Sequence, residues 1–138
     1  MFRRLVLLAV LVAFAAAPAS AWGAGAMELR PDPVDYHRVT VGATVTKKVT
    51  VINVGDTTLN ILAYSVDAER AVDTWRIISG SCGSSPLLPG DRCRFGLELT
   101  PGAVGDAAAS VYVRSYNYET GTYDVQSPTI AAVAHVVG

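Results

Sequence analysis

Hydrophobic and polar residues alternate with a period of two along most of this chain. The clearest case is residues 93–99, where Cys93, Phe95, Leu97 and Leu99 alternate with charged or small residues. Successive side chains of a strand point to opposite faces of a sheet, so this pattern predicts a half-buried β-strand. Similar patterns predict strands over 43–54, 59–66, 75–78, 107–116 and 129–137, and one or two short strands over 27–30 and 34–41, broken by Pro31 and Pro33.

The segments between these strands are rich in turn-forming residues. Residues 55–58 read Gly-Asp-Thr-Thr, and Pro101-Gly102 follows the strand over 93–99. Such residues mark chain reversals. Residues 67–74 are polar and predict a loop or one short helical turn. Residues 117–126 predict a hairpin tip or a long loop.

The pattern therefore predicts an all-β protein of about seven or eight short antiparallel strands. Strands at intervals of roughly 8–14 residues are typical of a β-sandwich. A closed barrel of about eight strands is the alternative architecture. A helical bundle is excluded by the β-branched alternation and by the density of glycine and proline. Without an internal repeat or a linker, the sequence predicts one sandwich domain over residues 27–138.

The N-terminal residues 1–21 differ from the rest of the chain. Arg3 and Arg4 precede an unbroken apolar run over 5–17, and Ala19-Ser20-Ala21 forms a small-x-small cleavage site. This layout predicts a secretory signal peptide. The apolar run is shorter than the roughly 20 residues that a membrane-spanning helix needs. An uncleaved N-terminal anchor is the alternative, and a second small-x-small site over 24–26 leaves the cleavage position open.

Composition and charge change once this segment is set aside. The full chain of 138 residues is 51% hydrophobic and carries 11 basic and 12 acidic residues, a net charge of −1. Removing Arg3 and Arg4 leaves 9 basic against 12 acidic residues, a net charge of −3. This charge balance argues against a strongly basic nucleic-acid-binding protein, because a surface that follows phosphates needs clustered Lys and Arg. The sequence predicts an exported protein, periplasmic or extracellular, with no membrane span after cleavage and no nucleic-acid partner.

Cys82 and Cys93 are the only two cysteines. In an oxidising compartment paired thiols form disulfides, and two cysteines allow one pairing. Pro86, Pro89 and Gly90 lie between them and favour a chain reversal. A redox-active or metal-binding pair is the alternative, but metal sites require closer cysteine spacing and further ligands. The sequence therefore predicts a structural disulfide.

The order of several short motifs resembles the Ig-like modules of the abnormal-spindle/Hydin (ASH) group and of bacterial choice-of-anchor D repeats. The motifs are Asp35-Tyr36, Val-Gly-x-Thr over 41–44, Asn-x-Gly over 53–55, and the stretch from Cys82 to Cys93 with its Leu-x-Pro-Gly turn. A strand that ends in Thr-Pro at 100–101 follows.

This resemblance covers about residues 29–137. It implies an Ig-like sandwich that acts as a structural or protein-binding module, without catalytic or cofactor residues. The chain departs from the family at Tyr36-His37, where Phe-Gly is frequent, at Leu99, where the family usually has Phe, and over 112–123, which is longer and more aromatic.

No residue pattern in the sequence predicts a catalytic, cofactor or metal site. His37 and His135 are the only histidines, and motifs for serine hydrolases, P-loops and zinc peptidases are absent. His37 with Asp35 and Asp32 could form one corner of a metal site, but a surface position on a strand is the preferred interpretation. We therefore predict no enzyme activity and no cofactor.

The remaining candidate is a tyrosine-rich segment. Four tyrosines and one arginine lie within twelve residues: Tyr112, Arg114, Tyr116, Tyr118 and Tyr123. Tyrosine combines rigid contact area with a polar tip, which suits protein or sugar surfaces. The competing interpretation is a hairpin stabilised by cross-strand aromatic pairs.

We predict that the exported module is structural or binds another envelope or extracellular protein. The alternative is a carbohydrate-binding module that uses residues 112–123. Oligomeric state is not predicted.

Overall fold

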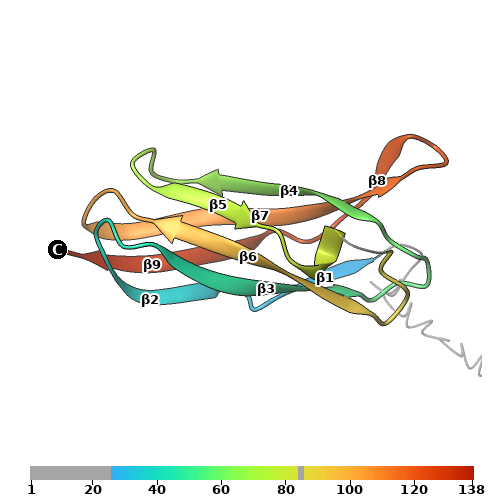
Figure 1. Ribbon diagram of the computed structural model, residues 1–138, viewed down its shortest axis with the longest axis horizontal. Coiled ribbons are helices and arrows are strands. Elements are labelled where there is room, and N and C mark those ends of the chain that lie inside the picture. Colours follow the sequence, from blue (N-terminus) through green and yellow to red (C-terminus); the bar gives the residue numbers. More distant parts are fainter. Residues whose placement is uncertain (1–25, 84–85) are drawn as a thin grey trace, which may run out of the picture.

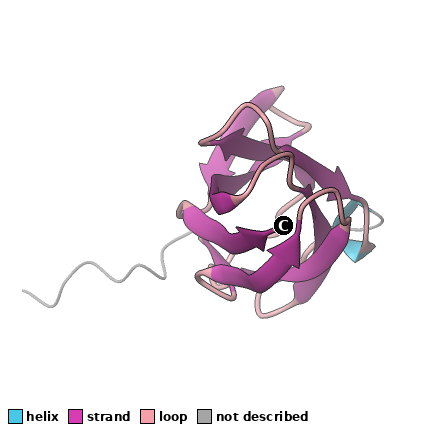
Figure 2. Cartoon of the chain, turned by 90° about the vertical axis from the view of Figure 1, so that its left-hand side faces the viewer, coloured by secondary structure: helices cyan, strands magenta, loops and turns pink. Residues whose placement is uncertain are grey.

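The computed structural model describes residues 26–83 and 86–138, so the predicted signal peptide over 1–21 lies outside the described residues. Two β-sheets pack face to face along the long axis of the molecule (Figure 1). Figure 2 looks along the strands and shows the two layers end-on. The strands are β1 (Met27–Arg30), β2 (Val34–Thr40), β3 (Val45–Asn53), β4 (Ile61–Ala68), β5 (Thr74–Ile78), β6 (Arg92–Thr100), β7 (Gly105–Asn117), β8 (Thr122–Gln126) and β9 (Ile130–Val137). A short 3-10 helix, η1 (Ser81–Gly83), follows β5.

The predicted all-β Ig-like sandwich is confirmed. Sheet A has the order β1-β3-β6-β5, and sheet B has the order β2-β9-β7-β4 with β8 paired to β7. The described residues form nine strands instead of seven or eight, because the segment 117–126 contains the tip of a hairpin and its second arm, β8. No helix of the described ranges is long and apolar enough to cross a membrane.

One pair departs from the predicted antiparallel arrangement, because β2 lies parallel to β9. Strand β1 pairs with β3 in sheet A, and β2 belongs to sheet B. Pro31 and Pro33 separate the two strands, and proline cannot donate a ladder hydrogen bond, so pairing stops there. The chain crosses between the sheets at this point and runs beside its own last strand.

The core consists of the inward-facing residues of both sheets. Phe95, Leu97 and Leu99 of β6 are almost fully buried, as are Val111 and Val113 of β7. The alternation that predicted β6 is therefore the alternation between core and surface. Burying such side chains contributes about 1.5–3 kcal/mol each before the cost of ordering them.

Tyr36 joins the two layers. Its hydroxyl donates a hydrogen bond to the carbonyl of Leu97, and its ring meets that of Trp75 edge-on, with 5.6 Å between centroids. Burial raises the pKa of the Tyr36 hydroxyl well above its usual value. Tyr36 therefore fills the core and also satisfies a backbone carbonyl of the opposite sheet.

The predicted disulfide is present between Cys82 and Cys93. It joins η1 to β6, and both cysteines are buried. Gly80 lies so close to β6 that a Cβ atom would stand 2.1 Å from the carbonyl oxygen of Arg94. The segment after β5 is therefore packed tightly against sheet A as well as covalently linked to it.

A partly buried ion pair closes one end of the sandwich. Asp73 accepts hydrogen bonds from Nε and Nη2 of Arg70, both at 2.8 Å, and from the backbone N–H of Gly102 at 3.2 Å. Arg70 also donates to the carbonyls of Ala103 and Val104. The hydrogen bonds from Arg70 are the main cause that lowers the pKa of the Asp73 carboxyl. This cluster fixes the β4–β5 loop to the β6–β7 loop.

Candidate functional site

The predicted tyrosine-rich segment forms a hairpin that extends past the body of the sandwich (Figure 1). We call residues 112–126 the tyrosine hairpin. It comprises the C-terminal part of β7, a four-residue tip and β8. Arg114 pairs with Gln126 and Asn117 with Thr122, and the register shifts between Ser115 and Tyr116.

The tip of the hairpin is set by Asn117 and Gly121. The side-chain Oδ1 of Asn117 accepts hydrogen bonds from the backbone N–H groups of Glu119 and Thr120, at 2.9 and 3.4 Å. The backbone N–H of Gly121 donates to the carbonyl of Asn117, with a φ of 70° at Gly121. Asn favours such local turns, and Gly adopts this left-handed conformation at little cost.

Ser127 anchors the base of the hairpin. Its backbone N–H donates to the carbonyl of Val113, and its hydroxyl accepts from the N–H of Val113, both at 2.9 Å. Ser127 is buried. Strands β8 and β9 therefore follow one another along the same side of β7, with Ser127 at the junction.

Tyr116 is the centre of an aromatic cluster. Its ring meets the rings of Tyr118 and Tyr123 edge-on, with centroids 5.1 and 5.3 Å apart. Tyr118 is 67% exposed and Tyr123 is 56% exposed, whereas Tyr116 is partly buried. Edge-on pairs of this kind contribute about 0.5–1.5 kcal/mol beyond area burial. Tyr116 thus supports the hairpin, and the two outer rings are presented to solvent.

The other two predicted residues lie at the base of the hairpin on the outer face of sheet B. The guanidinium carbon of Arg114 stands 5.5 Å from the ring centre of Tyr112, and Arg114 Nε donates to Gln126 Oε1 at 3.3 Å. Tyr112, Arg114 and Tyr123 line a small hollow of about 230 Å³ together with β4. The structure therefore brings all five predicted residues onto one hairpin.

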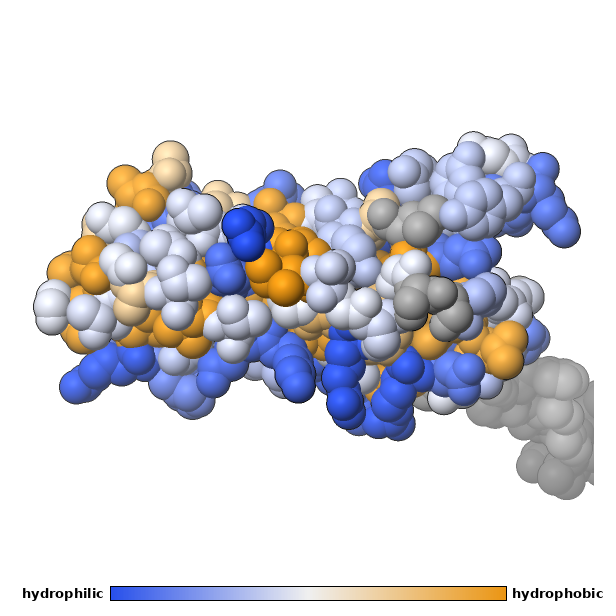
Figure 3. Space-filling view, viewed as in Figure 1, coloured by the Kyte–Doolittle hydropathy of each residue, from blue (hydrophilic) through white to orange (hydrophobic). Residues whose placement is uncertain are grey.

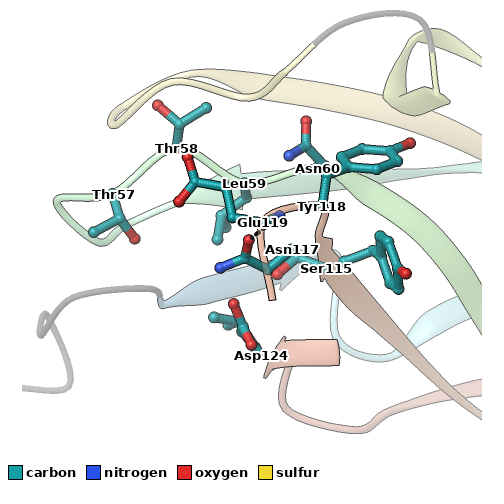
Figure 4. A pocket seen from close by; sticks show the side chains of 11 residues that line it. Thr57, Thr58, Leu59, Asn60, Ser115, Asn117, Tyr118, Glu119 and Asp124 are labelled. Atoms are coloured by element: carbon teal, nitrogen blue, oxygen red, sulfur yellow. Dashed lines mark hydrogen bonds between the residues drawn. The ribbon is translucent and has the colours of Figure 1, made fainter. Parts of the chain in front are cut away.

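A larger hollow of about 610 Å³ lies between the hairpin and the segment before β4. Figure 4 shows the side chains around it. It is lined by Thr57, Thr58, Leu59, Asn60, Ser115, Tyr116, Asn117, Tyr118, Glu119, Asp124 and Val125. The lining combines two tyrosines with hydroxyl, amide and carboxylate groups and contains no Lys, Arg or His. This set can donate and accept hydrogen bonds with a polar, uncharged or cationic ligand, and it disfavours an anion.

The wall formed by residues 57–60 was not predicted as part of a site. It is held by Asn53, which is fully buried. Asn53 Nδ2 donates to the carbonyls of Thr57 and Leu87, at 2.7 and 2.9 Å, and Oδ1 accepts from the N–H of Gly55 at 3.0 Å. In the sequence, the Asn-x-Gly motif indicated a chain reversal at this point. It did not indicate that the tyrosine hairpin would lie opposite the turn.

The backbone then ties this wall to the hairpin. The N–H of Tyr116 donates to the carbonyl of Asn60 at 2.8 Å. On the other side, Leu59 and Leu87 form an isolated bridge with two backbone hydrogen bonds. The wall therefore lies between the tyrosine hairpin and the loop closed by the disulfide.

The two histidines lie on exposed strand positions away from these hollows. His135 Nδ1 is 3.1 Å from Asp106 Oδ1, and His37 Nδ1 is 3.5 Å from Asp35 Oδ2. Asp32 does not complete a site with them; its Oδ1 instead accepts a hydrogen bond from the N–H of Ala131. Within residues 26–83 and 86–138, no group of three or more His, Cys, Asp or Glu could hold a metal ion.

Comparison with known proteins gives likeness of structure only. No family model and no curated protein matches the sequence. The secreted serine protease VesC from Vibrio cholerae matches with a TM-score of 0.58 and 18% identity over 80% of this chain. The ASH/PapD-like domain 7 of human CEP192 matches with a TM-score of 0.54 and 16% identity over 83% of this chain.

A part of the protease and most of the CEP192 domain share the fold of this chain. The match covers 23% of the protease chain and 87% of the CEP192 domain. The chain thus spans about a quarter of the protease, and at these identities the likeness extends to the fold alone. It supports the Ig-like fold that the resemblance of the sequence motifs to the ASH group implied.

Proposed function

We propose that this protein is an exported, non-catalytic Ig-like module that binds another envelope or extracellular protein through the tyrosine hairpin. The observation that carries the proposal is the exposure of Tyr118 and Tyr123 on a hairpin that extends past the sandwich. Tyrosine provides large contact area at low conformational cost, and such residues dominate binding energies at protein interfaces. The likeness of fold to an ASH/PapD-like domain supports a role as an interaction module.

Two features support export of the protein: the sequence of residues 1–21 and the disulfide. We propose that residues 1–21 are a signal peptide and that residues 27–138 form the exported domain. The Cys82–Cys93 disulfide is consistent with an oxidising compartment. The mass of the purified mature chain tests this proposal. A new N-terminus just after Ala21 or Ala26 supports it, and an intact Met1 contradicts it.

Affinity capture from the envelope fraction tests the binding role. The variant Tyr118→Ser/Tyr123→Ser removes both exposed rings and leaves Tyr116 in place. Val104→Ser is the matched control, because Val104 is 62% exposed and lies on the β6–β7 loop, away from the hairpin. A partner that is retained by wild type and by the control, and lost by the double variant at unchanged melting temperature, supports the proposal. Equal capture by all three contradicts it.

A second candidate function is carbohydrate binding, and the hollow of about 610 Å³ favours it. Tyrosine rings beside amide and carboxylate groups can stack on a sugar and bind its hydroxyls. Glycan-array screening separates the two candidates. A glycan signal that is lost in Asn60→Ala and Tyr118→Ser supports the sugar-binding role, and silence across the array rejects it.

A further inference from the structure

The basic residues of the described chain are concentrated on one sheet face. Outside the proposed signal peptide there are nine Lys and Arg residues against twelve Asp and Glu. Strand alternation places five of the nine on the outer surface of sheet A, which we call the basic face: Arg30, Lys48, Arg76, Arg92 and Arg94. In Figure 3, hydrophilic side chains line the lower edge of the molecule, below β2 and β3 and near β1.

The strand register places four of these cations close together. Arg30 and Arg94 both stand opposite Thr50, one on each side of β3. Arg92 is two residues along β6, and Lys48 is two residues along β3. With strands about 4.8 Å apart and about 3.4 Å per residue, the Cα atoms of Arg92, Lys48 and Arg30 lie roughly 7, 8 and 10 Å from that of Arg94.

Carboxylates neutralise only part of this charge. Glu28 is bonded to Arg30 at 2.6 Å, and Glu98 lies 3.7 Å from Arg76. Lys48, Arg92 and Arg94 have no ion pair among residues 26–83 and 86–138, and all three are exposed. Five cations and two carboxylates leave the basic face at +3 on a chain whose net charge outside the signal peptide is −3.

The arrangement of the charges indicates the shape of the partner. The cations are spread in two dimensions over adjacent strands of a regular sheet, rather than along one line or around one hollow. A linear polyanion is matched by a row or a groove, whereas a charged plane is matched by a two-dimensional array. We propose that the basic face binds the surface of an anionic phospholipid bilayer.

This proposal goes beyond partner binding and does not depend on it. Basic side chains near an anionic bilayer are attracted by its surface potential, without insertion into the membrane. With sheet A against the bilayer, the outer face of sheet B, with Tyr112 and Arg114, is turned away from it. The protein would then be held at a membrane surface and still present the base of the tyrosine hairpin to a partner.

Vesicle co-sedimentation tests the proposal on the purified protein. Vesicles of equal parts phosphatidylcholine and phosphatidylglycerol are compared with pure phosphatidylcholine. We expect binding to the anionic vesicles only. Raising the salt from about 0.01 M to about 0.15 M shortens the Debye length from about 30 Å to about 8 Å and should weaken this binding.

Two single variants distinguish vesicle binding through the basic face from binding through the net charge of the protein. Arg94→Glu and Arg38→Glu change the net charge equally, but Arg38 lies on β2 of sheet B. Arg94→Glu should weaken vesicle binding about tenfold or more, and Arg38→Glu should leave it close to wild type. Thermal melting verifies that each variant folds, and Arg92→Glu replaces Arg94→Glu if that variant does not.

Three results would overturn the proposal. The first is no wild-type binding to anionic vesicles at low salt. The second is an equal loss in Arg94→Glu and Arg38→Glu, which would assign the binding to net charge. The third is binding to soluble dextran sulfate or polyglutamate without binding to vesicles, which would assign the face to a linear polyanion or an acidic protein segment.

Discussion

Replacing Asn53 with alanine removes three hydrogen bonds from a fully buried side chain. The amide of Asn53 joins the β3–β4 turn to the disulfide loop through Gly55, Thr57 and Leu87. The backbone of Asn53 adds bonds to the carbonyl of Asp91 and from the N–H of Gly90. The alanine variant keeps these backbone bonds and loses only the side-chain bonds.

The size of the effect follows from the groups left behind. A typical intramolecular hydrogen bond contributes about 1 kcal/mol net, and a buried group left without a partner costs about 1–3 kcal/mol. Three bonds therefore predict that Asn53→Ala lowers the free energy of unfolding by about 3 kcal/mol. A domain of this size is typically stable by about 5–15 kcal/mol, so the change should be large but survivable.

The variant Asn53→Asp tests the same hydrogen bonds through the direction in which its stability changes with pH. Asn53→Asp keeps an oxygen that can accept from the N–H of Gly55. It also places a carboxylate oxygen against the carbonyl oxygens of Thr57 and Leu87. Burial and these carbonyls raise the folded-state pKa of the new carboxyl above its unfolded value of about 3.9. The free energy of unfolding of Asn53→Asp should therefore be closest to that of wild type at low pH. It should fall as the pH rises from about 4 toward the folded-state pKa of the new carboxyl.

Urea unfolding followed by tryptophan fluorescence measures both variants. Asn60→Ala is the matched control, because Asn60 lies on the same wall and makes no side-chain hydrogen bond within the described ranges. We expect the control to change stability by less than about 0.5 kcal/mol. A loss of under about 1 kcal/mol for Asn53→Ala, or an equal loss for Asn60→Ala, would refute the reasoning.

Three further predictions concern the rest of the fold. Reducing the disulfide should lower the free energy of unfolding by about 3 kcal/mol, because the denatured chain regains the freedom of its closed loop; an unchanged urea midpoint would contradict this. Gly102→Ala should cost at least about 1–3 kcal/mol, because its Cβ would lie 2.0 Å from the carbonyl oxygen of Val72, whereas Gly83→Ala has open space and should be nearly neutral. The lowered pKa of Asp73 means that its contribution to stability is present above the unfolded value of 3.8 and is lost as the pH falls below it. Asp73→Asn should therefore reduce the acid sensitivity of thermal melting, and an identical pH profile in both proteins would count against the ion pair.

Strands with one buried face were predictable from the sequence. Residues 92–100 form β6 as the alternation indicated, because Phe95 and its neighbours must leave water while the arginines must remain in it. Strand β8 was not predictable in the same way. Its residues Thr122 to Asp124 are exposed on both faces, so no hydrophobic period marks the strand.

Pairing between strands far apart in the sequence could not be predicted either. The parallel pair β2–β9 depends on which edge the chain reaches after its two prolines, and periodicity within one strand does not encode this. The candidate site shows the same limit. The tyrosines could be found because they are close in sequence, whereas the wall over 57–60 meets them only through Asn60 and Tyr116 in the folded chain.

The parallel pair β2–β9 also determines how the protein responds to tension. The described chain starts at β1 near one end of the long axis, and the C-terminus lies at the other end (Figure 1). A pull between the two ends draws β2 and β9 in opposite directions along their own axes. The hydrogen bonds between them are then loaded together in shear instead of opening one after another. The crossing of the chain between sheets thus makes the module mechanically stiff along its length, and the tyrosine hairpin lies outside this line of force.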